Sequence, residues 1–352
     1  LARLYLNAEG FGCTPDNVFK TVAAPEQYKG SFYDNCVRCC DAVINSGSYS
    51  IESDYFANFK IENNASRENI FVIVENGLTD DSRSNGSMSN KLRIVQNTHH
   101  YGVQFAYNML LDTWNGFCAR PEFLELYAET DVRGPGNEKN GTANTKQWGW
   151  FLGPVYKSGS TTDMYLDEDV IDEKNPNGTP TVIHAEVSSL TNAHNFDGAR
   201  LNKWEIDKES KYTYCENDFV LMRYADVLWM KEEAILRGGA GASGVNTDDF
   251  RTMLGRAFAY DGSSADKFKA AYPDFLTLEG ILDERGREFT WEMVRRRDLI
   301  RYNKFNDIQY VTDAKAKQEC RKWFPIPFSV LEKSLVVDGK KVWTQTPGYE
   351  NL

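Results

Sequence analysis

Apolar side chains recur at helical spacing near the start of the chain, and this predicts two helices, over residues 1–11 and 25–46. One face of the second helix consists of Tyr28, Phe32, Cys36, Cys40 and Val43. Pro25 suits a first helical turn, and Asn45-Ser46-Gly47 is a C-terminal stop signal. Small and aromatic residues in this spacing are typical of a helical hairpin of the tetratricopeptide kind.

The helical pattern returns in the last part of the chain. The predicted helices cover residues 217–237, 245–259 and about 278–302. Asn217-Asp218 and Asn246-Thr247-Asp248 are suitable N-terminal caps for the first two. In the tail, 323–352, the prolines of Phe324-Pro-Ile-Pro327 predict an extended chain instead of a helix.

The middle of the chain, from about 48 to 210, has a different pattern. Short apolar runs are separated by clusters of Asn, Gly, Ser and Asp. Ile70–Val74 and Thr181–His184 are candidate strands, but each is too short to build a sheet alone. Long irregular connections are uncommon inside a domain and often carry function, so we expect the functional residues here.

Charge and hydropathy exclude some classes of protein. The formal net charge is −11, and an acidic chain repels phosphate backbones, which argues against general nucleic-acid binding. No run of ~18 apolar residues is present, so we expect no membrane-spanning helix. The chain lacks a start Met and opens within a helical pattern. We therefore expect that an N-terminal part of the native protein, with any signal peptide or lipid anchor, is not included.

No metal or cofactor motif is complete. Cys36-x-x-Cys39 has no second half, which favours packing in a helical core over a disulfide or metal site. Gly239–Gly244 matches GxGxxG but follows a predicted helix, which favours an inter-helix loop over dinucleotide binding. We expect no cofactor and no metal, although the acids of Asp167-Glu168-Asp169 stay open as weak calcium candidates.

The stretch from 285 to 304 is rich in arginine and has a net positive charge. It could form a basic patch for nucleic acid. We favour ion pairing with Glu288, Glu292 and Asp298 at helical spacing, given the acidic total.

Aromatic residues make up 13% of the chain and concentrate between 99 and 165. Much of that segment is polar and Gly-rich, so not all of its rings can be core. Sugar rings present flat C–H faces that stack on aromatic faces, while their hydroxyls need polar partners. The candidate ligand-binding residues are Asn97, His100, Tyr101, Tyr107, Trp114, Asn115, Trp148 and Trp150. Phe117, Phe123 and Tyr127 are expected in the core, because Pro121 starts a short helix with an apolar face.

Several segments together resemble the SusD/RagB family of surface glycan-binding lipoproteins. The matching segments are Ala2–Glu9, Cys40–Gly47 with Tyr49–Tyr55, Trp114–Phe123 with Asp131–Arg133, Leu221–Leu228, Glu284–Phe289, Arg297–Arg301, Phe324–Pro327 and Gln345–Tyr349. Each match is weak alone, and their shared order over nearly the whole chain makes the resemblance specific.

The resemblance implies a mostly α fold, in which tetratricopeptide-like helix pairs scaffold a loop-rich insert with a few short strands. The expected divisions of this composite domain are a helical-repeat scaffold over 1–47, a glycan-binding insert over 48–210, and a helical scaffold with an extended tail over 211–352. It also implies lipid anchoring at the outer-membrane surface and a SusC-like TonB-dependent transporter as partner. The family's aromatic arc corresponds to about 97–115, which makes Tyr101, Tyr107 and Trp114 its candidates.

Three functions compete at this point. The first is non-catalytic binding of an oligosaccharide that is then delivered to the transporter. The second is a glycoside hydrolase, which needs two carboxylates ~5–9.5 Å apart; Glu122, Asp131 and Glu205 are available, but no pair stands out. The third is a helical-repeat interaction module without a glycan ligand, whose aromatic residues would anchor a protein interface.

Overall fold

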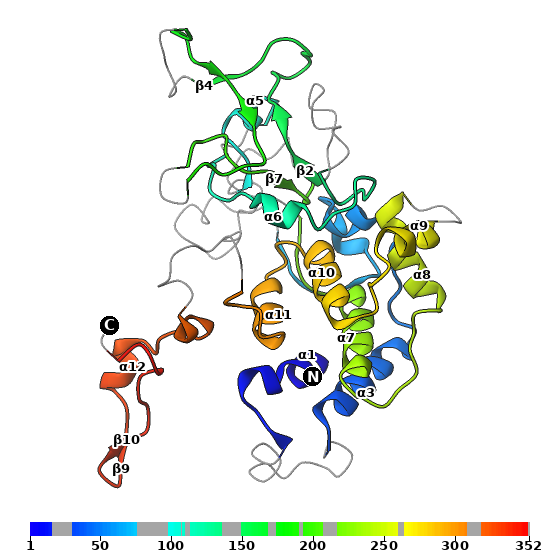
Figure 1. Ribbon diagram of the computed structural model, residues 1–352, viewed down its shortest axis with the longest axis vertical. Helices are drawn as coiled ribbons and strands as arrows, with labels where there is room; N and C mark the ends of the chain where they lie inside the picture. The colour runs from blue at the N-terminus through cyan, green and yellow to red at the C-terminus, as the bar shows by residue number, and fades with distance from the viewer. Residues whose placement is uncertain are drawn as a thin grey trace.

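The longer helices and most of the short strands lie in different parts of the molecule (Figure 1). The computed structural model describes residues 1–15, 30–75, 98–106, 108–109, 113–135, 149–167, 174–189, 193–206, 217–259, 264–307 and 318–350. A helical scaffold occupies the centre of Figure 1, and a loop-rich insert with short strands lies above it. The predicted mostly α architecture with a few short strands is confirmed.

The scaffold is built mainly from seven α-helices of the described chain. These are α1 (Ala2–Asn7), α3 (Phe32–Ile44), α7 (Tyr224–Leu236), α8 (Asp248–Gly255), α9 (Ser264–Ala271), α10 (Leu278–Glu288) and α11 (Arg295–Arg301). The 3₁₀ helices η1 (Glu9–Phe11) and η7 (Arg256–Phe258) extend α1 and α8. α3 packs against both α1 and α7, and α8 packs against α9.

α3 begins where the sequence offers a cap. The Ser31 hydroxyl accepts a hydrogen bond from the backbone N–H of Tyr33 at 3.1 Å, which satisfies one of the free donors of the first turn. The predicted helix over 25–46 is confirmed from Phe32 to Ile44, whereas 16–29 lies outside the described residues.

Two other predicted helices differ from the structure. Of the helix predicted over 217–237, Phe219–Arg223 is strand β8, and α7 starts only at Tyr224. The side chains predicted as caps have other partners: Asn217 Nδ2 donates to the backbone oxygen of Phe59 at 3.0 Å, and Asp218 Oδ1 accepts from the backbone N–H of Glu75 at 2.9 Å. The helix predicted over 278–302 is divided into α10 and α11 by a turn.

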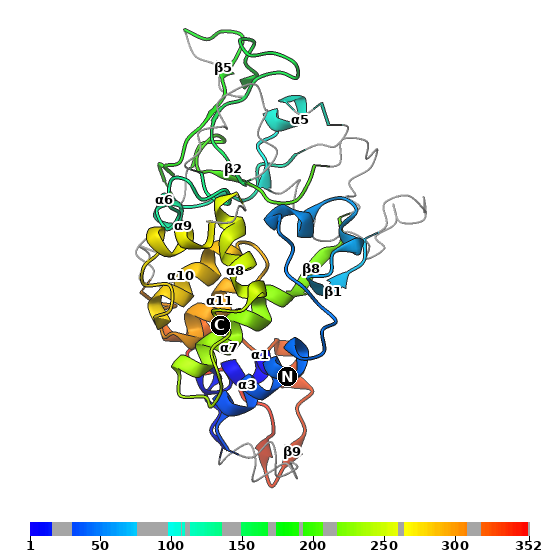
Figure 2. The ribbon, with the colours of Figure 1, turned by 90° about the vertical axis from the view of Figure 1, so that its right-hand side faces the viewer.

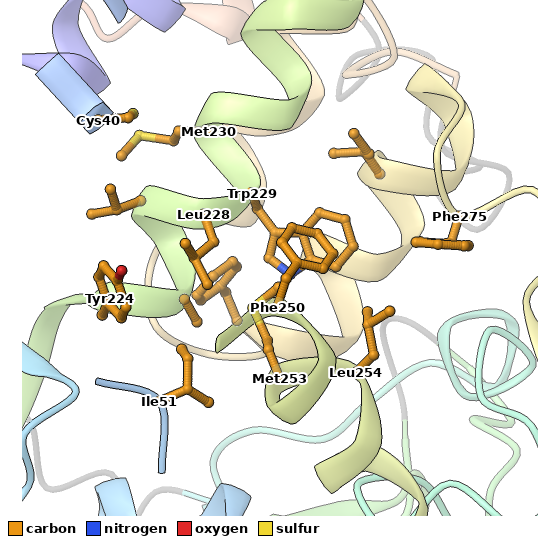
Figure 3. Packing of buried hydrophobic residues seen from close by; sticks show 14 of the residues in the cluster. Cys40, Ile51, Tyr224, Leu228, Trp229, Met230, Phe250, Met253, Leu254 and Phe275 are labelled. Atoms are coloured by element: carbon orange, nitrogen blue, oxygen red, sulfur yellow. The ribbon is translucent and has the colours of Figure 1, made fainter. Parts of the chain in front are cut away.

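The scaffold core lies between α3, α7, α8 and α10. Figure 3 shows the Trp229 ring of α7 beside Phe250 of α8, with ring centroids 5.0 Å apart. Cys36 and Cys40 are completely buried in the same cluster, so their predicted role as small core residues is confirmed.

The GxGxxG segment is the loop between α7 and α8, as predicted. Its backbone amides bind carboxylates of the same chain: Ala240 N donates to Asp34 at 2.7 Å, and Gly244 N donates to Glu232 at 2.6 Å. These two amides are therefore used for packing the loop against α3 and α7.

The insert contains short antiparallel pairs instead of one sheet. The pairs are β1 (Asn69–Ile73) with β8 (Phe219–Arg223), β2 (Gly149–Phe151) with β7 (Arg200–Asn202), β3 (Gly153–Pro154) with β6 (Val182–Ile183), and β4 (Leu166–Asp167) with β5 (Thr179–Pro180). The short helices of the insert are α5 (Gly102–Ala106), α6 (Pro121–Leu124), η3 (Tyr55–Phe59) and η4 (Asn63–Ala65). β8 continues directly into α7, so the β1–β8 pair joins the insert to the scaffold (Figure 2).

The insert has its own apolar core. Trp150, Phe151 and Phe59 are buried there, and the Trp204 ring stacks on Phe219 with centroids 5.7 Å apart. The predicted strand Ile70–Val74 is confirmed as β1, and Thr181–His184 contains β6.

The C-terminal segment, 318–350, forms an arm beside α11 (Figure 1). It contains η8 (Glu319–Lys322), α12 (Phe328–Glu332), β9 (Val336–Val337) and β10 (Lys340–Lys341). The prediction of an extended tail is therefore only partly correct. The hairpin turns at Asp338-Gly339, where both residues have positive φ, because a two-residue turn with this hand matches the twist of the strands.

Glu288, at the end of α10, is the centre of a buried ion-pair network. Its carboxylate accepts hydrogen bonds from Arg223 at 2.9 Å, Arg256 at 2.6 Å and Arg133 at 2.9 Å. Glu68 accepts from Arg223 and Arg256 as well. All five side chains are buried. Because Glu68 and Arg133 belong to the insert, the network connects the two parts of the molecule.

Burial alone would raise the pKa of the Glu288 carboxyl, because a buried charge loses its hydration. The guanidinium groups of Arg256, Arg223 and Arg133 outweigh burial and hold the pKa of Glu288 well below its usual range. The carboxylate is therefore charged at neutral pH, and its removal would leave buried positive charges without their partner.

The arginine-rich stretch from 285 to 304 forms ion pairs, as predicted, although two of the predicted acids have other partners. Asp298 accepts hydrogen bonds from Arg285 at 2.8 Å and from Arg301 at 2.9 Å. Glu288 and Glu292 pair instead with bases from outside the stretch. These contacts belong to the fold and leave no support for a nucleic-acid patch.

We expect Glu288→Gln to lower the free energy of unfolding by about 3–5 kcal/mol, because it removes the one carboxylate shared by three buried guanidinium groups and leaves the network one negative charge short. Urea denaturation followed by circular dichroism measures the effect. Asp163→Asn is the control, since Asp163 and Lys157 form an exposed pair, and we expect no measurable change there. Equal stability of Glu288→Gln and the parent would contradict the structural role of the network.

Candidate functional site

Exposed aromatic rings gather on the segment from 98 to 120 in the insert. Phe105 is 50% exposed, Trp114 43% and Phe117 59%. Large apolar rings that face water singly are common, but three within one short segment indicate a binding surface. The described part of this segment is therefore the candidate site.

Two buried histidines fix the backbone beneath these rings. The backbone N–H of Asn115 donates to the backbone carbonyl oxygen of His99 at 2.9 Å, and the Thr113 hydroxyl donates to the backbone carbonyl oxygen of His100 at 2.8 Å. The N–H of Gly102 donates to His100 Nδ1 at 2.9 Å. These bonds hold residues 113–115 against 99–100, so Trp114 projects from a fixed backbone. We call His99 and His100 with these bonds the histidine anchor.

Burial, together with the nearby Arg200 guanidinium, lowers the pKa of His99 to about 3. Burial and Arg200 also lower the pKa of His100 to about 4, against the opposing effect of Asp167. Both imidazoles are therefore neutral at pH 7, which suits their buried positions.

Aromatic contacts lead from these histidines to the surface at Phe105. The Tyr101 ring stacks on His100 with centroids 4.2 Å apart, and its hydroxyl bonds to Asp167 and Asn195. The Phe105 ring stacks on Tyr165 at 5.0 Å, with an angle of 11° between the planes. Phe105 is thus supported from below by another ring.

Phe117 is held by contacts of its backbone and its ring. Its carbonyl oxygen accepts from Arg200 at 3.2 Å, and Arg200 is buried. Its ring lies edge-to-face with Trp291, at 5.9 Å and 88°. Trp291 comes from the scaffold, from the turn between α10 and α11, so the candidate site touches both parts of the molecule.

The structure changes the set of predicted ligand-binding residues. Asn97, Tyr107 and Trp148 lie outside the described residues. Trp114 is exposed, whereas Tyr101 and Asn115 are partly buried. Tyr101 and Asn115 contact the buried histidines directly: the Tyr101 ring stacks on His100, and the backbone N–H of Asn115 bonds to His99.

Two predicted residues are buried and cannot face a ligand as they stand. Trp150 in β2 is completely buried, and its ring packs edge-to-face against Phe123 and Tyr127. Its prediction as a ligand-binding residue is wrong, because the three-residue strand places it in the insert core. His100 is also completely buried and supports the site from beneath.

Sequence reasoning missed three rings at this surface. Phe117 was expected in the core and is exposed, whereas Phe123 and Tyr127 do pack on the insert core as predicted. Phe105 lies in the five-residue helix α5 and Phe117 in irregular chain, and neither stretch is long enough to show a periodicity that separates inner from outer positions. Trp291 lies in a stretch predicted to be one continuous helix, with no Gly or Pro to mark the turn.

The carboxylates considered for hydrolysis each have a structural partner. Asp131 is buried and pairs with Arg133 at 2.8 Å. Glu205 accepts from the backbone N–H of Ile61 at 2.9 Å, and Glu122 lies 3.4 Å from Arg120. These contacts favour structural roles for the three acids.

Within the described ranges, no group of three or more His, Cys, Asp or Glu side chains is placed to hold a metal ion. Of the weak calcium candidates, Glu168 and Asp169 lie outside those ranges, and Asp167 accepts the hydrogen bond of Tyr101. No helix in the described part of the chain has both the length and the apolar character needed to cross a membrane.

Comparison with known proteins gives consistent matches. The model of the SusD family matches residues 68–349. Among curated proteins, the starch-binding protein SusD of Bacteroides thetaiotaomicron is 31% identical over 124 residues, which is 34% of this chain and 20% of that protein.

The solved structures with similar folds are longer than this chain. Surface glycan-binding protein A from Bacteroides fluxus has a TM-score of 0.59 at 20% sequence identity, and the match covers 90% of this chain and 58% of the B. fluxus chain. NanU of B. fragilis has a TM-score of 0.57 at 20% sequence identity, and the match covers 99% of this chain and 62% of NanU. Surface glycan-binding protein A from B. thetaiotaomicron in complex with laminarihexaose has a TM-score of 0.52 at 20% identity, with 89% and 59% covered. The chain thus spans about three-fifths of these structures, and the likeness shows the fold.

We expect the two buried histidines to make the fold sensitive to mild acid. An unfolded histidine has a pKa near 6.5, so as pH falls below that value the unfolded state binds protons that the folded state does not. Each histidine should then cost about 1.4 kcal/mol of stability per pH unit. Between pH 6.5 and 5.5 the carboxylates with lowered pKa contribute little, because unfolded carboxyl groups are still ionised there.

Urea denaturation at several pH values in that window measures the slope. His99→Gln should reduce the slope by about half, and His184→Gln, at an exposed position, should leave it unchanged. An unchanged slope in His99→Gln would mean that His99 is not held neutral in the folded protein.

Proposed function

The chain belongs to the SusD family, and from this premise we propose that it binds an oligosaccharide at the cell surface without altering it chemically. The bound glycan then passes to a SusC-like TonB-dependent transporter of the outer membrane, and a lipid anchor holds the full-length protein at that surface. The observation that carries the proposal is the group of exposed rings at Phe105, Trp114 and Phe117.

The rings suit a sugar ligand because they are both exposed and fixed. Burial of the apolar face of a pyranose against a ring releases water, and a ring already held in place loses little freedom on binding. The histidine anchor holds the backbone at Trp114, Tyr165 supports Phe105, and Arg200 holds the backbone at Phe117. A flexible loop with the same residues would bind more weakly.

Polar groups for the sugar hydroxyls lie next to one of these rings, Phe105. The backbone N–H of Ser158 donates to the oxygen of Phe105 at 3.2 Å, which brings the exposed Lys157–Asp163 pair to the same area. Ammonium and carboxylate groups together donate to and accept from hydroxyls. The relatives named above include one that binds starch and one solved with laminarihexaose, which supports glycan as the ligand class.

We expect Trp114→Ala to weaken oligosaccharide binding by about tenfold or more, because loss of an exposed ring removes its stacking contact. Isothermal titration calorimetry against laminarihexaose, maltohexaose and host-type glycans measures the affinity. Phe71→Ala is the control: Phe71 is also exposed, at 57%, but belongs to β1 beside the scaffold, and its loss should leave the affinity unchanged.

Several outcomes would contradict the proposal. Unchanged affinity in Trp114→Ala would remove this site, and absence of binding to every glycan by the full-length protein would remove the function. Release of reducing sugar from a bound oligosaccharide would favour a hydrolase. Copurification with a transporter, without any glycan-dependent rise in melting temperature, would favour an interaction module.

A further inference from the structure

The turn between α10 and α11 has an unusual backbone. Trp291 has a φ of 59° and Met293 a φ of 61°, and neither is glycine. L-residues other than glycine seldom adopt this left-handed backbone conformation, because it brings the Cβ atom close to the carbonyl oxygen. Residues with bulky side chains adopt it least often. Such a conformation persists only when its surroundings determine it, and it is found most often at functional sites.

Lys203 of the insert holds this turn on both sides of Trp291. Its ammonium group donates to the backbone oxygens of Glu288 at 3.2 Å and Thr290 at 3.0 Å, and to the Glu292 carboxylate at 2.5 Å. Lys203 and Glu292 are both buried. The residues before and after Trp291 are therefore fixed, and the turn cannot relax without breaking buried ionic contacts.

Arg223 binds the same carboxylate. Its guanidinium donates to Glu292 at 2.8 and 2.9 Å, and it also pairs with Glu288. The turn is thus connected to the network that joins insert and scaffold. The direction of the Trp291 ring is set by this network and not by its own backbone preference.

The Trp291 ring extends from the insert core toward the candidate site. One contact is with the completely buried Trp150, at 6.4 Å and 88°, and another is with the exposed Phe117, at 5.9 Å and 88°. Trp291 itself is partly exposed. A ring in this position is fixed at one side by the core and is accessible at the other, next to a ring that faces water.

We propose that Trp291 is a sugar-contacting residue that the scaffold contributes to the binding face, where it forms with Phe117 a subsite for one pyranose ring. This inference rests on the proposed function. The strained, clamped turn is the means by which the ring is presented. A ligand at this subsite touches the insert through Phe117 and the scaffold through Trp291, so binding also depends on the contact between the two parts.

A purely structural role for Trp291, filling space beside Trp150, makes a different prediction, and two substitutions separate the roles. Trp291→Leu keeps an apolar side chain but has no flat ring, whereas Trp291→Phe keeps a ring. We expect Trp291→Leu to weaken oligosaccharide binding by about tenfold and Trp291→Phe to retain most of the affinity. The measurement is calorimetry with laminarihexaose, maltohexaose and host-type glycans, with melting temperatures recorded alongside.

Met293→Ala is the matched control. Met293 has the same backbone conformation, two residues away in the same turn, and its exposed side chain has no place in the subsite. Its affinity should equal that of the parent. If Trp291→Leu lowers the melting temperature but binds the glycan as the parent does, Trp291 is a packing residue and the proposal is overturned.

The remaining outcomes distinguish this proposal from the function on which it rests. Loss of affinity in Trp114→Ala but not in Trp291→Leu overturns the Trp291 subsite and leaves glycan binding in place. An equal loss of affinity in Trp291→Leu and Trp291→Phe overturns the stacking role, since the ring kept in Trp291→Phe should preserve most of the affinity. If the parent binds none of the glycans, both the function and the subsite are wrong.

Discussion

The insert and the scaffold depend on one buried interaction, the set of charges around Glu288. Three guanidinium groups from different segments reach this carboxylate, and Glu68 and Glu292 complete the balance of charge. Because the charges are out of water, each is stable only while its partners are in place. A network of this kind adds little net stability compared with an apolar core, but it permits few alternative arrangements. It therefore fixes how the loop-rich part sits on the helices.

The binding surface depends on the same arrangement. Lys203 and Glu292 extend the network to the turn that carries Trp291, and Trp291 meets Phe117 of the insert. Beneath the other exposed rings, the backbone is held by hydrogen bonds to neutral histidines and not by ion pairs. The rings are consequently fixed although they stand on irregular chain or, for Phe105, on one short helix. A surface of this kind suits a ligand such as a sugar, which offers flat apolar faces and weak polar contacts.

The helical parts of the fold could be predicted because their signals are local. Apolar spacing and Thr247 as cap give α8, and the core face with Cys36 and Cys40 gives α3. The failures have tertiary causes. Phe219–Arg223 is a strand because Asn69–Ile73 pairs with it, and the stretch from 278 to 302 is broken because Lys203 and Arg223 hold the turn between α10 and α11. Nothing within either segment records these distant partners.

The sequence by itself determined the fold class, the family, the arginine-rich stretch as a source of ion pairs and the segment that carries the aromatic rings. Each of these follows from spacing, composition or ordered motifs, which are properties of neighbouring residues. Only the tertiary structure decided which rings face water. The sequence favours a ligand contact for Trp150 and a core position for Phe117, yet the pairing of β2 with β7 buries Trp150, and Arg200 and Trp291 hold Phe117 at the surface. In irregular chain, exposure is set by contacts between distant residues, and no local period encodes it.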